Sequence, residues 1–127
     1  MGNQSINVVE VGVITRYLRE QSDPGAQRFA FAYTVHIRNH GNQAVQLIDR
    51  RWLITDGNGK VREVVGDGVV GEQPLIQPGA EYTYSSGCLL DTPVGSMEGH
   101  YGMLAADGSR FNAQIQRFRL AMPNALN

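Results

Sequence analysis

The chain has 127 residues, with 11 basic and 12 acidic side chains and a net charge of −1. This length fits one domain that can bury a hydrophobic core without disulfides or metals. Hydrophobic residues make up 42% and charged residues 18%, which excludes a disordered chain. The near-zero net charge also excludes a strong nonspecific nucleic-acid binder, because such proteins carry a clear basic excess.

The sequence also bears on the cellular compartment. Cys88 is the only cysteine, so no intrachain disulfide can form. The N-terminus lacks the basic start and apolar run of a signal peptide. No segment approaches the roughly 20 apolar residues of a membrane-spanning helix. We therefore expect a cytoplasmic protein that makes no contact with membranes.

The first half of the chain shows a hydrophobic period of two, which is typical of β-strands. Residues 9–17 form the first predicted strand, and residues 29–38 form the clearest one, with aromatic and β-branched residues on one side. A turn at 39–42 closes it. A third strand covers about 45–55, and Asp56-Gly57-Asn58-Gly59 predicts a hairpin that leads into a return strand over 60–65.

The second half begins with a glycine-rich stretch over 66–79, which ends in a predicted type II turn at Pro78-Gly79. Strands follow over 81–88, 98–105 and 110–121, with a hairpin turn at Asp107-Gly108 between the last two. The apolar set of the last strand shifts face, which predicts a β-bulge near Gln116 and Arg117. Residues 123–127 are expected to be a loose tail.

These patterns predict an all-β fold, because no segment has a sustained helical stripe. About seven or eight strands with frequent turns favour a two-sheet antiparallel sandwich, formed by residues 1–127 as a single domain. The expected core contains the following aromatic side chains: Phe29, Phe31, Tyr33, Trp52, Tyr82, Tyr84, Tyr101 and Phe118.

The start of the glycine-rich stretch has the G-x-G-x-x-G pattern of dinucleotide-binding loops. Those loops need a helix, whose N-terminus meets the pyrophosphate, and Pro74 and Pro78 exclude one here. A weaker hypothesis is an anion site in which the backbone amides of Gly66, Gly68 and Gly71, helped by Arg62, bind a phosphate or nucleotide. The alternative is that the glycines serve tight turns and close backbone approach.

Other candidate chemistry is sparse. His36 and His40 would lie about 13 Å apart in an extended strand, too far to share an ion, so we predict no metal site and no cofactor. Cys88 falls on a predicted core strand without a neighbouring histidine, which favours an inert thiol. We therefore predict no catalytic residue and no enzymatic activity.

Arg50 and Arg51 stand beside Trp52, and this group has two interpretations. It could be a basic and aromatic patch that binds RNA or a protein partner. Alternatively, one of the two arginines shares the face of Trp52 by alternation and has a structural role at a sheet edge.

Together these motifs resemble the ApaG domain, a family also called CorD or DUF525, over nearly the whole chain. Two blocks are the most specific: Val-Val-Gly-Glu-Gln-Pro at 69–74 and Met-Glu-Gly-His-Tyr at 97–101. Other matching residues are Tyr33, Val35, Ile37, Asn39, Val45, Gln46, Leu47, Arg50, Trp52, Ile54, Asp56, Gly59, Gly66, Asp67, Gly68, Pro78, Gly79, Tyr84, Ser86, Gly87, Leu90, Thr92, Pro93, Gly95, Met103, Phe111, Ile115, Phe118 and Leu120.

The resemblance implies an immunoglobulin- or fibronectin-III-like sandwich without assigned catalytic residues. It also implies two functional contexts. Bacterial members are loosely linked to cobalt and magnesium efflux, whereas eukaryotic copies occur in F-box proteins and in a DNA-polymerase-delta-interacting protein. The second context favours a protein-binding module.

Our main expectation is therefore a non-enzymatic module that binds a protein partner whose identity the sequence does not reveal. Edge strands of a sandwich could also pair two copies of the chain. The alternatives are a phosphate- or nucleotide-binding module that uses the loop from Gly66 to Gly71, and an accessory role in cobalt or magnesium homeostasis.

Overall fold

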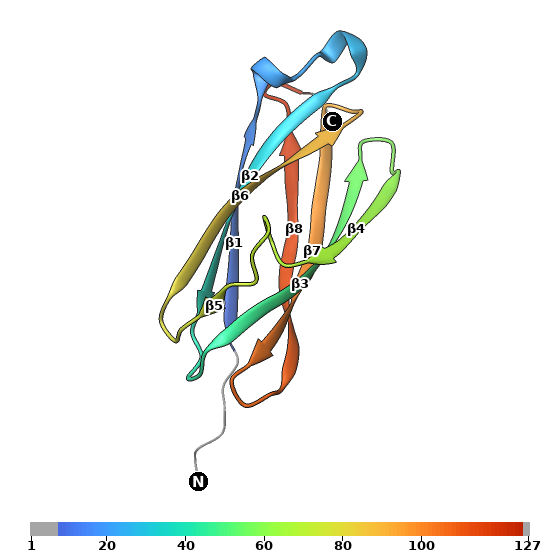
Figure 1. The fold of residues 1–127 in the computed structure, drawn as a ribbon. Helices are drawn as coiled ribbons and strands as arrows, with labels where there is room; N and C mark the ends of the chain where they lie inside the picture. Colours follow the sequence, from blue (N-terminus) through green and yellow to red (C-terminus); the bar gives the residue numbers. More distant parts are fainter. Residues whose placement is uncertain (1–7, 126–127) are drawn as a thin grey trace.

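The computed structural model describes residues 8–125, which form two facing antiparallel sheets (Figure 1). The first sheet has the order β1-β2-β6, with the bounds β1 (Val9–Tyr17), β2 (Phe29–Asn39) and β6 (Glu81–Leu90). The second has the order β4-β3-β7-β8, with β5 also paired to β3, and the bounds β3 (Val45–Asp56), β4 (Val61–Asp67), β5 (Leu75–Ile76), β7 (Val94–Ala105) and β8 (Arg110–Ala121). Two short 3-10 helices join β1 to β2, namely η1 (Arg19–Gln21) and η2 (Pro24–Ala26). The predicted all-β, immunoglobulin- or fibronectin-III-like sandwich is confirmed.

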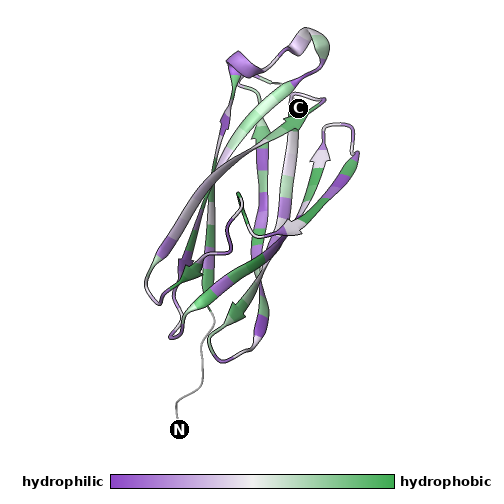
Figure 2. Cartoon of the chain, viewed as in Figure 1, coloured by the Kyte–Doolittle hydropathy of each residue, from purple (hydrophilic) through white to green (hydrophobic). Residues whose placement is uncertain are grey.

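The alternation of side chains along each strand explains why the two sheets face each other. Phe31, Val35 and Ile37 of β2 are buried, whereas Arg38 on the other face is exposed. Figure 2 shows the same alternation of apolar and polar residues along other strands. Burial of one apolar face on each sheet supplies the main driving force for folding.

Aromatic rings fill the centre of the core, as predicted. The Trp52 ring lies edge-on to Tyr33, Phe118 and Tyr101, with ring centroids 5.4, 5.8 and 6.2 Å away. Of the eight aromatic residues expected there, all are buried except Tyr82 and Phe118, which are half-buried and pack against the core. Edge-to-face contacts of this kind add to the stabilisation by burial.

The predicted bulge in β8 is confirmed. Met97 of β7 pairs with Phe118 and Gly99 pairs with Ile115, so Gln116 and Arg117 of β8 oppose a single residue of β7. The extra residue brings both Ile115 and Phe118 to the inner face of the sheet.

Several boundaries differ from the sequence prediction. β4 continues to Asp67, because Gly66 still pairs with Arg50, and β6 continues to Leu90. β7 begins at Val94 rather than at residue 98. β5 and the two 3-10 helices were not predicted, since elements of two or three residues are too short to show a hydrophobic period.

The predicted turns are present. Gly59 and Gly108 have φ of 83° and 89° in the hairpin loops that follow β3 and β7. Gly79 has φ of 80°, and the Ala80 amide donates to the Gln77 carbonyl at 2.9 Å, as the predicted type II turn requires.

In the expected tail, the Ala125 amide donates to the Met122 carbonyl at 3.1 Å, and residues 126–127 lie outside the described part of the chain.

Candidate binding cleft between the open sheet edges

The glycine-rich stretch runs from the end of β4 to the start of β6 and contains a tight hairpin. Val69 and Glu72 exchange two backbone hydrogen bonds of 2.8 and 2.9 Å. The two residues between them, Val70 and Gly71, have φ of 44° and 81°. Positive φ at both central positions is the mark of a type I′ turn, which favours glycine.

Gly68 is required by a close backbone approach, and a side chain at Gly66 would displace the Arg50 guanidinium. A Cβ atom on Gly66 would lie 2.8 Å from the Arg50 guanidinium, and one on Gly68 would lie 2.3 Å from the Glu72 carbonyl oxygen. The Gly68 amide already donates to the Ile48 carbonyl at 2.8 Å. These contacts support the turn and close-approach alternative for the glycines, and anion binding by this loop stays a prediction.

Arg62, the fourth residue of the predicted anion site, points away from the loop. Its Nη2 donates to the Leu89 carbonyl of β6 at 2.8 Å and lies 3.7 Å from the Cys88 sulfur. Arg50 holds the loop instead, because its Nη1 donates to the carbonyls of Asp67 and Gly68 at 3.0 and 2.7 Å. The structure therefore groups Gly66 and Gly68 with Arg50, and it places Arg62 on the neighbouring surface, where its side chain reaches β6.

Arg50 is the arginine that shares the face of Trp52, and its structural role agrees with the sequence interpretation. The expected position at a sheet edge is wrong. Arg50 pairs with Gly66 on one side and with Tyr101 on the other, so its strand lies inside the sheet. Alternation along a strand gives the face of a residue but does not show which strands become its neighbours.

A cleft of about 700 Å³ opens between β4 and β6, the edge strands on one side of the sandwich. This volume is within the usual range of ligand sites. The opposite side is closed, because β1 packs against β8. The cleft is lined by Leu18, Gln21, Arg28, Ala30, Phe31, Tyr33, Arg50, Trp52, Ile54, Arg62, Val64, Ser86, Gly87, Cys88, Leu89 and Met97.

Three arginines and no carboxylate line this cleft: Arg28, Arg50 and Arg62. Asp56 and Asp91 line a smaller adjoining hollow together with Arg62. Outside the cleft, each of the following arginines has a carboxylate partner within 4 Å: Arg38, Arg51, Arg110 and Arg117. The cleft therefore concentrates positive charge without a compensating anion from residues 8–125.

Many arginine donors in the cleft are unused by residues 8–125. Arg50 bonds only through Nη1 and Arg62 only through Nη2, and the Arg28 side chain makes no hydrogen bond to the described residues. A guanidinium carries five N–H donors in a fixed planar arrangement. The geometry therefore offers several donors to a ligand without breaking existing contacts.

Burial raises the pKa of the Cys88 thiol, although Arg62 nearby acts in the opposite direction. Burial likewise raises the pKa of the Tyr33 phenol. Both groups therefore stay protonated at neutral pH. A protonated thiol is a poor nucleophile.

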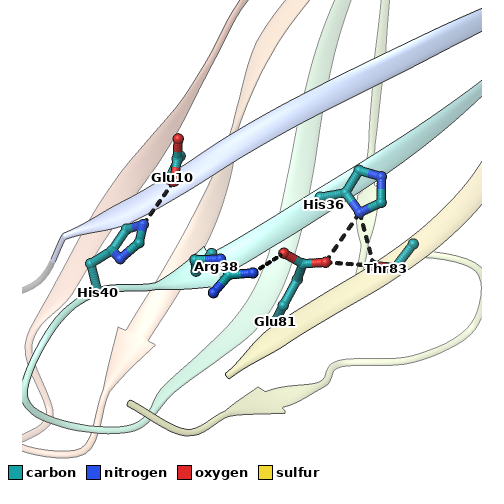
Figure 3. A network of polar contacts seen from close by, with 6 residues as sticks. All are labelled: Glu10, His36, Arg38, His40, Glu81 and Thr83. Carbon is teal, nitrogen blue, oxygen red and sulfur yellow. Dashed lines mark hydrogen bonds and ion pairs between the residues drawn. The ribbon is translucent and has the colours of Figure 1, made fainter. Parts of the chain in front are cut away.

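Two histidines, His36 and His40, lie outside the cleft and have separate partners (Figure 3). On the outer face of the first sheet, His36 contacts Glu81 at 3.2 Å, whereas His40 contacts Glu10 at 2.7 Å. His100 lies on β7, in the other sheet. Within residues 8–125, no group of three or more His, Cys, Asp or Glu side chains could hold a metal ion. In the same residues, no helix is long and apolar enough to cross a membrane.

The sequence did not reveal the cleft. Its arginines stand at positions 28, 50 and 62, on a turn and two strands, and the facing residues of β6 come 24 or more positions after Arg62. The only available signal was the alternation that puts Arg50, Trp52 and Ile54 on one face. This alternation could not show that the edge strands β4 and β6 leave a cleft between them.

Comparison with known proteins agrees with this architecture. A family model described as the ApaG domain matches residues 19–105. The chain is 56% identical to Protein ApaG of Pseudomonas putida and 60% identical to Protein ApaG of Pseudomonas paraeruginosa, each over 94% of both chains.

Solved structures give the same result. A crystal structure of a Bordetella pertussis protein named ApaA superposes with a TM-score of 0.91 at 49% identity, covering 94% of this chain and 97% of that one. A protein from Archaeoglobus fulgidus, only 8% identical, has a TM-score of 0.55 and shares the fold alone. From the extent and identity of these matches, the chain belongs to the ApaG family.

Proposed function

We propose that this protein is a non-enzymatic module that binds a segment of a partner protein in the cleft between β4 and β6. One observation carries the proposal: the sandwich is closed where β1 meets β8 and open where β4 faces β6. A cleft of about 700 Å³ between two sheet edges can accommodate an extended polypeptide segment.

The edge strands support a polypeptide ligand. β4 pairs only with β3, and β6 pairs only with β2, so each strand has one edge without a partner strand among residues 8–125. An extended segment can pair with such an edge and place alternate side chains in the cleft. The same edges would allow self-association, which is the alternative occupant.

The groups in the cleft favour binding over chemistry. Cys88 is its only thiol, and burial disfavours the reactive thiolate form of that residue. The cleft contains no histidine or carboxylate that could act as a general base beside it.

The proposal can be tested by filling the cleft. Ser86 lies on the inner face of β6 and lines the cleft, whereas the adjacent Ser85 points outward and contacts Thr34. Ser86→Tyr should block the cleft, and Ser85→Tyr is the matched control on the same strand. We expect a partner captured from native lysate by the wild type to be retained by Ser85→Tyr and lost with Ser86→Tyr. Equal capture by both variants would contradict the proposal, as would an absence of any captured partner.

Circular dichroism and thermal unfolding of both variants should accompany the capture experiment. If Ser86→Tyr remains folded, a lost partner reports on the cleft and not on the fold. Size-exclusion chromatography across a range of concentrations separates a foreign partner from a second copy. A dimer that Ser86→Tyr disrupts would identify self-association as the function of the cleft.

The two other functions suggested by the sequence remain predictions with their own tests. A nucleotide or diphosphate bound by the loop from Gly66 to Gly71, at 100 times its dissociation constant, would stabilise the fold by roughly 2.7 kcal/mol. The absence of a thermal shift would dismiss that site. For a role in cobalt or magnesium homeostasis, normal cobalt tolerance of a deletion strain would be the contradicting result.

A further inference from the structure

We infer that the bound segment is acidic: a Glu or Asp side chain of the partner is bound by Arg28, Arg50 and Arg62, beside an apolar neighbour. This inference rests on the proposed function and specifies its ligand. It assigns these arginines to a carboxylate site that binds a partner protein.

Charge complementarity is the first argument. The chain has a net charge of −1, yet the cleft lining contains three arginines and no acidic residue. Like charges gathered without a counter-ion repel one another, and a bound anion relieves this repulsion. A neutral or basic segment would leave it in place.

The geometry of the arginines is the second argument. Arg50 is fixed by the carbonyls of Asp67 and Gly68 and lies against Gly66, which has no side chain to displace it. Its Nε and Nη2 make no hydrogen bond to residues 8–125. A guanidinium that is held in place loses little side-chain entropy on binding and can bind a carboxylate through two parallel hydrogen bonds.

Arg62 complements Arg50 from the neighbouring strand of the same sheet. It is exposed and reaches from β4 to the Leu89 carbonyl on β6, so it spans the cleft opening. Its Nε and Nη1 have no partner among the described residues. Arg28, also exposed, contributes a third guanidinium from the turn before β2.

Apolar residues of the lining explain why the ligand should be a protein segment and not free phosphate. Leu89 is 54% exposed, while Leu18 and Val64 are half-buried. Inorganic phosphate would leave these side chains and the unpaired strand edges in water. A segment with an acidic residue and an apolar neighbour would use the arginines, the apolar side chains and a strand edge together.

The test starts from a random peptide library displayed against the full chain, with clones that still bind Ser86→Tyr removed. We expect the remaining clones to be enriched in Asp or Glu next to an aliphatic or aromatic residue. An enriched peptide is then synthesised in two forms, one with the acidic residue and one with the corresponding amide. Their affinities are measured with the wild type and with Arg28→Gln, Arg62→Gln and the control Arg119→Gln, which changes an exposed arginine of β8.

We expect the amide form of the peptide, and each of the two cleft variants, to weaken binding about tenfold or more, since a hydrogen bond to a charged group contributes about 1.5–3 kcal/mol. Arg119→Gln should change the affinity by no more than about twofold, because exposed substitutions away from a site have small effects. Circular dichroism of each variant shows that the fold is retained.

The outcomes separate the inference from the proposed function. Clones that depend on Ser86 but show no acidic preference would overturn the acidic anchor and leave the cleft as a peptide site. Clones that never depend on Ser86 would overturn both. Displacement of the peptide by inorganic phosphate, but not by chloride at equal ionic strength, would replace the acidic segment with a phosphate-bearing ligand.

Discussion

The two sides of this sandwich differ although both are built from the same kind of strand. On the closed side, β1 packs against β8 and the inner residue Leu120 is fully buried. On the open side, β4 and β6 leave a cleft lined by arginines. The difference lies in the residues that occupy inward-facing positions at each edge.

On the open side, an inner position of the edge strand β4 and one of its neighbour β3 carry arginine. Arg50 pairs with Gly66, and Arg62 pairs with Ile54, so both lie on the face that elsewhere forms the core. Burial of a guanidinium without a charged partner is strongly unfavourable, so arginine at these positions disfavours closure of the two sheets over each other. The cleft therefore lies where two neighbouring strands carry arginine on their inner face.

The largest expected effect tests how differently the two sides contribute to stability. Leu120→Ala would leave a cavity in the closed side and should lower the free energy of unfolding by about 3–5 kcal/mol. Leu89→Ala, on the exposed rim of the cleft, should change it by no more than about 0.5 kcal/mol. Urea unfolding measured by circular dichroism gives both values. Similar losses for the two variants would mean that the open side closes in solution.

A smaller effect concerns the loop that positions Arg50. Gly68→Ala would place a Cβ 2.3 Å from the Glu72 carbonyl oxygen at a φ of 62°. Gly59→Ala is the matched control, because Gly59 has φ of 83° but nothing within 4 Å of its Cβ position. Positive φ costs alanine roughly 1–2 kcal/mol at either site.

The close contact at Gly68 should add about 1–3 kcal/mol to the loss of stability, measured as the difference in unfolding free energy between the two variants. Equal losses would show that the loop can move away from Glu72. In that case Arg50 would not be rigidly placed, and the contrast between a fixed Arg50 and the exposed Arg62 would weaken.

The alternation of apolar and polar residues along the strands predicted most of the fold. This pattern is local, because the face on which a side chain lies depends on its position along its own strand. The bulge at Gln116 and Arg117 could be read in the same way, from an apolar set that changes face. The two-residue strand β5 could not, because its pairing with Val45 depends on a contact between distant segments.

The candidate site was less predictable, because it too depends on contacts between segments that are distant in the sequence. Sequence suggested either an anion site or close backbone approach at Gly66 and Gly68, but it could not show what lies beside them, namely Arg50 and the Glu72 carbonyl. Arg62 was assigned to the loop because it is near in sequence, whereas its side chain crosses to Leu89. Side-chain direction across the gap between two sheets depends on sheet order, which local pattern does not encode.

The smallest expected effect contrasts the cleft arginines with an arginine that has a carboxylate partner, Arg38. Arg38 donates to Glu81 at 2.8 Å on the solvent face of the first sheet, and His36 contacts the same carboxylate (Figure 3). Arg38, followed by His36, lowers the pKa of Glu81 below its ordinary value of 4.5. A lowered pKa in the folded state adds stability that is present above the unfolded pKa and is lost as the pH falls through the folded pKa.

The free energy of unfolding of the wild type should therefore fall as the pH drops below about 4.5, and Glu81→Gln should remove part of this fall. Because the pair is exposed, solvent and salt screen it, so the difference should shrink further in high salt. Urea unfolding across this pH range measures it, with Glu20→Gln as the control for loss of one exposed negative charge. If Glu81→Gln retained the full acid-dependent fall, Arg38 would gain nothing from its carboxylate. An exposed arginine would then gain little stabilisation from a carboxylate partner. In that case, only the enclosure of the cleft could make its arginines select an acidic ligand.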